Sequence, residues 1–158
     1  MKWSRFFTLL ACVLLPLIIG SLSGLANAGS LNDWYVQLNK PNFNPPGYLF
    51  GPVWTVLYLL MGVSLYLIWK SPKGKQRTNA LIIFGVQMFL NFVWSFIFFY
   101  FRQIGLALID IIALWLMIVY MIFNFHKINK VAAYIQIPYL LWVSFATVLN
   151  ASIWMLNR

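Results

Sequence analysis

Long apolar runs, separated by short polar segments, dominate the pattern of this chain. There are five of them, at about residues 6–25, 48–69, 79–101, 106–125 and 131–156. Each run is continuous, and each is close to the roughly 20 residues that a transmembrane helix needs. The strands of a membrane barrel would instead give short segments of alternating polarity. The pattern therefore predicts an all-α integral membrane protein, a five-helix transmembrane bundle forming a single domain over residues 1–158.

The longest polar segment connects the first two apolar runs, at residues 27–47. Proline fixes φ, lacks a backbone N–H and favours an extended conformation at the preceding residue. We therefore expect a stiff, non-helical loop that lies over a pocket in the bundle as a lid. Its prolines and large aromatic residues are Trp34, Pro41, Phe43, Pro45 and Pro46.

The first apolar run has two interpretations. Lys2 and Arg5 precede it and the small residues of 25–28 follow it, which is the arrangement of a secretory signal peptide. However, the run is long enough to span a membrane, and Gly20 and Gly24 have the four-residue spacing of helix-packing motifs. We favour a retained transmembrane helix over a cleaved signal.

Two features constrain the later helices. Only residues 102–105 separate the third run from the fourth, so these two helices should form an antiparallel hairpin. Pro138 lies inside the fifth run, where it should bend the helix or interrupt its hydrogen bonding.

Composition excludes a soluble domain, because 63% of the residues are hydrophobic and only 8% are charged. Soluble domains average about 45–50% apolar and about 25% charged residues. The net charge of +9 does not indicate a nucleic-acid partner, because the basic residues lie in short loops between the runs. Membrane topology already accounts for basic residues at those positions.

The basic residues also predict an orientation. With five spans, eight of them fall on the side of the N-terminus and three on the other side. The first set is Lys2, Arg5, Lys70, Lys73, Lys75, Arg77, Lys127 and Lys130, and the second is Lys40, Arg102 and Arg158. The positive-inside rule then places the N-terminus in the cytoplasm, with the lid loop and the C-terminus outside. We expect a bacterial cell membrane, although an outer-membrane location stays open.

The chain has few residues that carry conventional chemistry. Cys12 and His126 are its single cysteine and histidine, and Asp33 and Asp110 are its two acidic residues. This set rules out internal disulfides, a cysteine metal site and a paired-carboxylate mechanism. Asp110 lies within a span and is a functional candidate for that reason. We expect it instead to be structural, hydrated near the interface or paired with Arg102.

Polar and aromatic residues inside the spans are the better candidates. Gln87, Asn91, Trp94 and Phe98 follow one another at i, i+4, i+7 and i+11, so they share one face of the third helix. Polar groups avoid lipid, so this face should point inward. It could serve only as hydrogen-bonding contact between helices, or it could line a pocket; we weight the two readings equally.

Aromatic residues on two other helices favour the pocket. Trp54 and Tyr58 share a face of the second helix, while Trp142, Ala146 and Leu149 share a face of the fifth. The small Ala146 beside the large Trp142 would leave a hollow for a flat ligand. A mostly apolar cavity between helices is the usual form of a small-molecule site.

These residues together resemble the TspO/MBR family, which includes bacterial tryptophan-rich sensory proteins and the mitochondrial translocator protein, or peripheral-type benzodiazepine receptor. The resemblance covers about residues 16–154. Its motifs are Trp34-Tyr35, Leu38, Lys40-Pro41, Pro45-Pro46, Pro52-Val53-Trp54, Leu57-Tyr58, Met61-Gly62, Gln87, Asn91, Trp94, Phe98-Phe99, Arg102, Gly105, Ala107-Leu108, Asp110, Pro138-Tyr139-Leu140, Trp142 and residues 145–150.

The resemblance implies a five-helix bundle, commonly a homodimer, that binds porphyrins such as protoporphyrin IX and requires no cofactor. It implies a lid made of the loop residues named above. Some relatives promote light- and oxygen-dependent porphyrin breakdown, and the tryptophans implicated there match Trp54 and Trp142. The ligand-binding residues that we expect are Gly51, Trp54, Tyr58, Asn91, Trp94, Trp142, Ala146 and Leu149.

The sequence departs from the family pattern at three places. Phe43 stands where many relatives have Trp, and Leu106 where the animal proteins have Trp. Residues 151–155 lack the Tyr and basic residue of the animal cholesterol motif. We therefore do not predict sterol transport, and whether sterols bind stays open. Three functions stay open: a porphyrin sensor, buffer or transporter; a porphyrin-degrading enzyme; and a structural membrane partner without a small ligand.

Overall fold

Helices form almost the whole chain, as the apolar runs predicted. The computed structural model describes residues 2–158. Along the described chain the order is α1 (Lys2–Asn32), α2 (Trp34–Gln37), α3 (Gly47–Trp69), α4 (Lys75–Ser95), the π-helix η1 (Phe96–Tyr100), α5 (Ile104–Ile128), α6 (Lys130–Ile135) and α7 (Ile137–Leu156).

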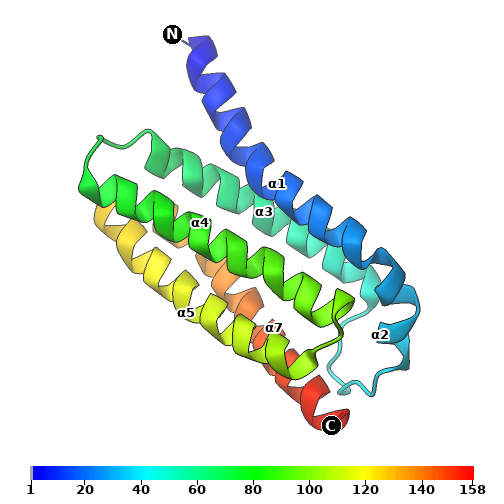
Figure 1. Ribbon diagram of the computed structural model, residues 1–158. Helices are drawn as coiled ribbons and strands as arrows, with labels where there is room; N and C mark the ends of the chain where they lie inside the picture. Colours follow the sequence, from blue (N-terminus) through cyan, green and yellow to red (C-terminus); the bar gives the residue numbers. More distant parts are fainter. Residues whose placement is uncertain (1) are drawn as a thin grey trace.

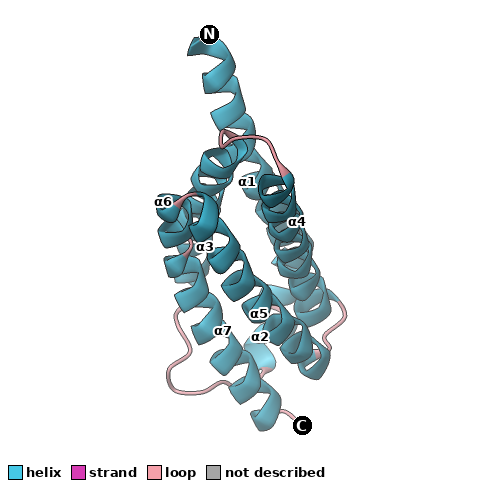
Figure 2. Cartoon of the chain, turned by 90° about the vertical axis from the view of Figure 1, so that its left-hand side faces the viewer, coloured by secondary structure: helices cyan, strands magenta, loops and turns pink. Residues whose placement is uncertain are grey.

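Five stretches of the described chain are long and apolar enough to cross a membrane: Lys2–Asn32, Gly47–Trp69, Lys75–Tyr100, Ile104–Ile128 and Lys130–Leu156. They lie alongside one another, with the start of α1 and the end of α7 at opposite ends of the molecule (Figure 1). The connections lie at the ends of the bundle (Figure 2). The prediction of a five-helix membrane bundle is confirmed.

The first helix is longer than the sequence suggested. α1 continues to Asn32, so the prediction that the lid loop begins at residue 27 is wrong. Helix-forming Ala26, Ala28 and Leu31 continue the helix, and the next proline is as far along as Pro41. The short α2 that follows also corrects the prediction of a wholly non-helical loop. The extended, proline-containing part lies between α2 and α3.

α1 packs closely along α3. A Cβ added at Gly62 would clash with the backbone of Val13 on α1. It would also lie 2.8 Å from the carbonyl oxygen of Cys12. At Gly20 an added Cβ would collide with the ring of Tyr58. Small residues at such crossings let helix backbones approach in a membrane, where the hydrophobic effect does not drive association.

The third and fourth spans form the predicted antiparallel hairpin. Its turn places Arg102 in the left-handed region, at φ 57°. The Arg102 guanidinium lies 5.8 Å from the centre of the Trp34 ring. Asp110 does not form the pair with Arg102 that we considered, since its Oδ2 is buried without a hydrogen-bond partner.

The fifth span is interrupted where its proline predicted. α6 ends at Ile135, Gln136 follows, and Pro138 occupies the first turn of α7. Proline is favoured there because its missing N–H is not needed to continue the helix. The Leu140 N–H donates to the Gln136 carbonyl at 3.1 Å, which closes the first turn of α7.

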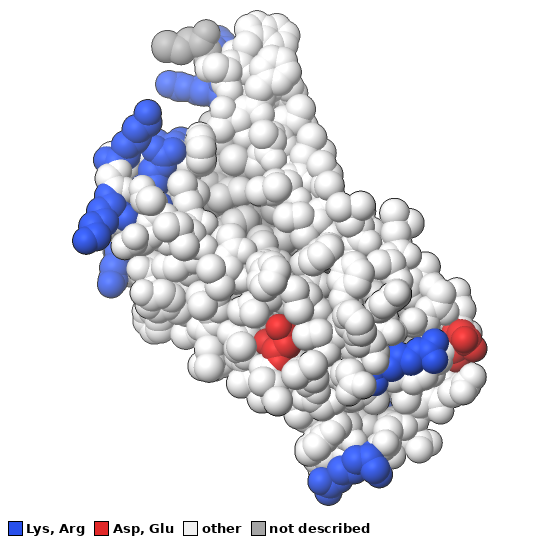
Figure 3. Space-filling model, in the orientation of Figure 1, with Lys and Arg blue, Asp and Glu red and all other residues white. Residues whose placement is uncertain are grey.

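Lys and Arg side chains gather at the end of the bundle where α1 begins and where α3 connects to α4 (Figure 3). The guanidinium of Arg77 lies 4.8 Å from the centre of the Trp69 ring, and the ammonium of Lys70 lies 5.5 Å from that of Tyr66. Few basic residues lie at the opposite end (Figure 3). The orientation in the membrane was predicted from this uneven distribution of Lys and Arg between the two ends of the bundle.

Candidate functional site

A cavity of about 320 Å³ lies among the helices, in the half of the bundle nearer α2. Pockets for small molecules usually measure about 300–1,000 Å³. Its walls come from α1, α2, α3, α4, η1 and α7. The lining residues are Leu17, Gly20, Ser21, Ser23, Gly24, Asn27, Leu31, Tyr35, Phe50, Gly51, Trp54, Thr55, Tyr58, Trp94, Ser95, Phe98, Phe99, Ala146, Leu149, Asn150 and Ile153.

The cavity exists because α1 presents small side chains to it. Gly20, Ser23, Gly24 and Asn27 follow at three- and four-residue spacing, so they share a face of the helix. At Gly24 an added Cβ would meet no atom within 4 Å. This glycine therefore borders open space and contacts no other helix of the described chain.

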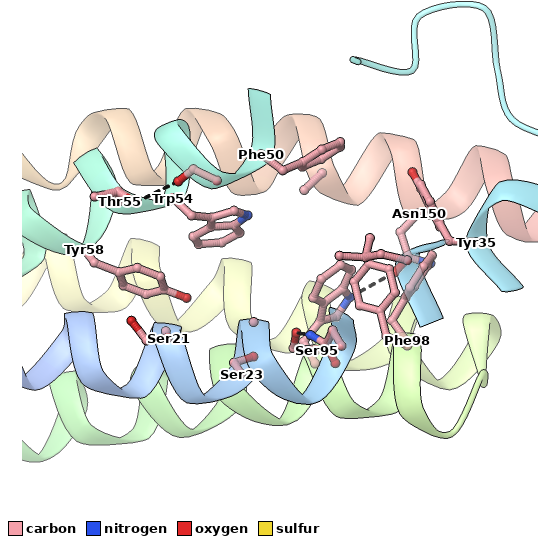
Figure 4. A pocket seen from close by; sticks show the side chains of 18 of the residues that line it. Ser21, Ser23, Tyr35, Phe50, Trp54, Thr55, Tyr58, Ser95, Phe98 and Asn150 are labelled. Atoms are coloured by element: carbon pink, nitrogen blue, oxygen red, sulfur yellow. Dashed lines mark hydrogen bonds between the residues drawn. The ribbon is translucent and has the colours of Figure 1, made fainter. Parts of the chain in front are cut away.

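The wall opposite α1 is aromatic. Phe50, Trp54 and Tyr58 come from α3 and face the α1 serines Ser21 and Ser23 across the cavity (Figure 4). The rings of Trp54 and Tyr58 are stacked, with centroids 5.4 Å apart and planes 27° apart. They present flat apolar surfaces suited to a planar ligand.

A second aromatic wall comes from α4 and η1. Trp94 stacks on Phe98 with ring centroids 5.1 Å apart. The Trp94 indole N–H donates to Asn150 Oδ1 at 3.0 Å, and Asn150 Nδ2 donates to the Ile104 carbonyl at 3.1 Å. These bonds hold the indole at a fixed angle within the wall.

A chain of hydrogen bonds closes the floor of the cavity. The Tyr58 hydroxyl donates to Asn91 Oδ1 at 2.9 Å, and Asn91 Nδ2 donates to the Tyr139 hydroxyl at 2.9 Å. Tyr139 in turn donates to Gln87 Oε1 at 2.9 Å. The inward face of the third span is thus confirmed. Both readings of that face hold, because Gln87 and Asn91 join helices while Trp94 lines the cavity.

A smaller hollow of about 50 Å³ adjoins this floor and is lined by Asn91. It shares Trp54, Tyr58, Trp94 and Ala146 with the main cavity. A ligand in the main cavity would therefore lie close to the Asn91 carboxamide.

The cavity reaches the surface between α1 and α3. Ser21 and Gly24 on α1 and Gly51 and Thr55 on α3 all line it and are exposed. These residues are small, so they leave a gap between the two helices. The opening faces sideways, toward the surface that lipid would cover.

The segment from α2 to α3 covers the end of the bundle, but only Tyr35 from it touches the cavity. Its ring lies 5.7 Å from that of Phe99, and its hydroxyl donates to Asn44 Oδ1 at 3.0 Å. Burial raises the pKa of the Tyr35 hydroxyl, and the bond to Asn44 partly lowers it. The Lys40 ammonium lies 4.9 Å from the centre of the Tyr35 ring.

The residues predicted to form the lid do not contact the cavity as Tyr35 does. Trp34 packs against Phe98 and Phe43 against Phe145, with ring centroids 5.8 and 6.3 Å apart. The prolines shape the loop: the Asn44 N–H donates to the carbonyl of Pro41 at 3.0 Å. The five predicted lid residues Trp34, Pro41, Phe43, Pro45 and Pro46 are not among those that line the cavity.

Most of the predicted ligand-binding residues meet in one place. Gly51, Trp54, Tyr58, Trp94, Ala146 and Leu149 line the main cavity, and Asn91 lines the hollow beneath it. Trp142 lines neither. It packs edge-on against Phe50 at 6.0 Å and lies 5.5 Å from Phe145, so Phe50 presents its ring to the cavity instead.

Sequence reasoning missed the contribution of α1 entirely. Ser21, Ser23 and Asn27 on α1, and Ser95 at the end of α4, supply polar groups to the cavity. The signal was present, since small and polar residues recur on one face of an otherwise apolar run. No group of three or more His, Cys, Asp or Glu side chains is placed to hold a metal ion within residues 2–158.

Comparisons with known proteins agree with the motifs. The TspO/MBR family model matches residues 12–155. The chain is 36% identical to the tryptophan-rich protein TspO of Chlorobaculum tepidum over 154 residues, which cover 97% of this chain and 98% of that protein. It is 31% identical to the tryptophan-rich sensory protein of Cereibacter sphaeroides over 157 residues, 99% of this chain and 94% of that protein. It is 35% identical to the translocator protein of Bos taurus over 147 residues, 92% of this chain and 87% of that protein.

Proposed function

This chain belongs to the TspO/MBR family of membrane proteins, and we propose that it binds porphyrins such as protoporphyrin IX in the cavity between α1, α3, α4 and α7. The observation that carries the proposal is the pair of aromatic walls, Trp54 on Tyr58 and Trp94 on Phe98, on two sides of one cavity. A porphyrin is flat, apolar and wide. It would lie between these walls, with part of its ring reaching into the gap between α1 and α3.

Binding rather than turnover fits the groups that are present. Asn91 at the floor is a neutral carboxamide bonded to the Tyr58 and Tyr139 hydroxyls, a group that can hold a ligand by hydrogen bonds. In this role the protein would act as a porphyrin sensor, buffer or transporter in the membrane. The sideways opening suits a ligand that arrives from the bilayer.

Titration of protoporphyrin IX against tryptophan fluorescence tests the proposal. Trp54 lines the cavity and Trp142 lies behind Phe50. We therefore expect saturable quenching that is weakened by Trp54→Phe more than by Trp142→Phe. The two variants make the same chemical change, so Trp142→Phe is the matched control. Quenching that does not saturate, or that is unchanged in Trp54→Phe, would count against a site in this cavity.

A second candidate is light- and oxygen-dependent breakdown of the bound porphyrin. It is favoured by the stack of Trp54 on Tyr58 at 5.4 Å, which would place an oxidisable indole against the ring. The porphyrin itself would absorb the light. Porphyrin absorbance followed in light and in darkness separates this activity from binding alone. Loss in light that continues unchanged in Trp54→Phe would exclude Trp54 as the electron donor.

A further inference from the structure

The α1 side of the cavity carries a polar group that stacking of an apolar ring does not use. Asn27 is only 3% exposed. Its Nδ2 donates a hydrogen bond to Ser95 Oγ on α4. Its Oδ1 is buried and has no hydrogen-bond partner. Among the residues that line the cavity in the described chain, Asn27 is the one with such a buried, unpartnered side-chain atom.

An unpaired carboxamide oxygen is costly inside a membrane protein. A buried polar group that gives up water without gaining a partner loses its solvation energy. The bond to Ser95 fixes the other end of the carboxamide. Two donors that line the cavity are already engaged: the Tyr58 hydroxyl donates to Asn91, and the Trp94 indole N–H donates to Asn150. Neither supplies a donor to Asn27.

The surroundings of Asn27 also leave room for a ligand. Gly24, about one turn before it on α1, borders open space, and Ser23 lies on the same wall. Figure 4 shows Ser23 and Ser95 together on this side, across the cavity from Trp54. A ligand that stacks on the aromatic wall would therefore turn one edge toward Asn27.

We propose that Asn27 selects, among flat ring ligands, those that present a hydrogen-bond donor, an O–H or N–H, at the edge facing α1. This inference rests on the proposed function, because it takes the cavity to be a porphyrin site. For porphyrins it means a preference for hydroxyl-bearing substituents at that edge. A vinyl group there would leave Oδ1 buried and unpaired, whereas a hydroxyl would donate to it.

Two porphyrins make a matched pair for the test. Haematoporphyrin has the ring and propionates of protoporphyrin IX, but carries hydroxyethyl groups in place of the two vinyl groups. Dissociation constants for both are measured by tryptophan quenching in one detergent, for the wild type and for Asn27→Leu. We expect the substitution to shift the ratio of the two constants by about tenfold against haematoporphyrin, the effect of one hydrogen bond.

The ratio separates selection from a structural role. The cost of removing the haematoporphyrin hydroxyls from water is the same for every variant. It therefore cancels when the ratio of the two dissociation constants is compared between the wild type and a variant. Asn32→Leu makes the same change at an exposed position of α1 outside the cavity, and it should leave the ratio unchanged. Asn27→Ala provides the same comparison should the leucine variant not fold.

The possible results are distinct. An unchanged ratio in Asn27→Leu, or equal weakening of both porphyrins, would overturn the role of Asn27 while leaving porphyrin binding intact. Failure of the wild type to bind either porphyrin would refute the proposed function itself, and this inference with it. A ratio that shifts in Asn27→Leu but not in Asn32→Leu supports the proposal.

Discussion

The hydrogen-bonded chain at the floor of the cavity ties three helices together through one residue. Asn91 on α4 accepts from the Tyr58 hydroxyl on α3 and donates to the Tyr139 hydroxyl on α7, both at 2.9 Å. Asn91→Leu removes both bonds and keeps a side chain of similar size. The Tyr58 hydroxyl then loses its acceptor, while Tyr139 still donates to Gln87 at 2.9 Å. We predict that Asn91→Leu destabilises the bundle.

The expected size follows from these bonds. Hydrogen bonds between membrane helices average about 0.6 kcal/mol and reach about 1.7 kcal/mol each. Two bonds therefore give about 1–3 kcal/mol. Asn91 is 5% exposed and Tyr139 is 1% exposed, so water replaces the lost partners poorly. The loss should lie toward the upper end of this range.

Reversible unfolding by SDS in mixed micelles measures the free energy of unfolding. Asn124→Leu is the matched control, because its Nδ2 donates only to the Tyr120 carbonyl of its own helix, at 2.8 Å. A double-mutant cycle with Tyr58→Phe isolates one bond, and its coupling energy should be about 1 kcal/mol. The reasoning would be refuted if Asn91→Leu lowered the free energy of unfolding no more than Asn124→Leu does and showed no coupling energy with Tyr58→Phe.

Three further predictions follow from the same packing. Gly62→Ala should lower the free energy of unfolding by about 1–3 kcal/mol, because the new Cβ would clash with the backbone of α1. Gly85→Ala is the control and should be tolerated, because its Cβ would meet no atom within 4 Å. Thermal unfolding of the two variants compares them. Trp115→Phe should cost about 0.6–1.7 kcal/mol through loss of the 2.7 Å bond to Ser144 Oγ, and the same loss in a Ser144→Ala background would contradict this origin. A reporter fused after Arg158 should lie outside the cytoplasm, because the basic residues gather at the other end of the bundle. A reporter found in the cytoplasm would show that the predicted orientation is wrong.

Much of the fold could be predicted because lipid leaves few alternatives. A continuous apolar run of this length must satisfy its own backbone as a helix, so five runs gave five spans. The inward face of α4 could be predicted for the same reason: Gln87 and Asn91 are polar and avoid lipid. Pro138 marked the interruption of the last span because proline lacks a backbone donor.

Other features depended on contacts that spacing does not encode. Trp142 shares a helix face with Ala146, yet the Phe50 ring from α3 lies against it and lines the cavity in its place. The loop prediction failed at its start because helix-forming residues extend α1 to Asn32. Tyr35 and Trp34 both pack against η1, yet only Tyr35 lines the cavity, and Phe43 packs against Phe145 instead.

The two uses of small residues on α1 and α3 explain why the cavity lies where it does. Toward the start of α1, Gly62 brings the backbones of α1 and α3 together at Val13. About one turn beyond the Gly20 contact, Gly24 meets no partner, because the wide Trp54 and Trp94 rings stand across the cavity. Because α1 is held close to α3 near Val13 and faces the bulky Trp54 and Trp94 rings beyond Gly20, a gap remains between these elements. Larger residues on α1 would fill that gap, so the side chains of α1, more than those of the lid loop, set the size and chemistry of the cavity.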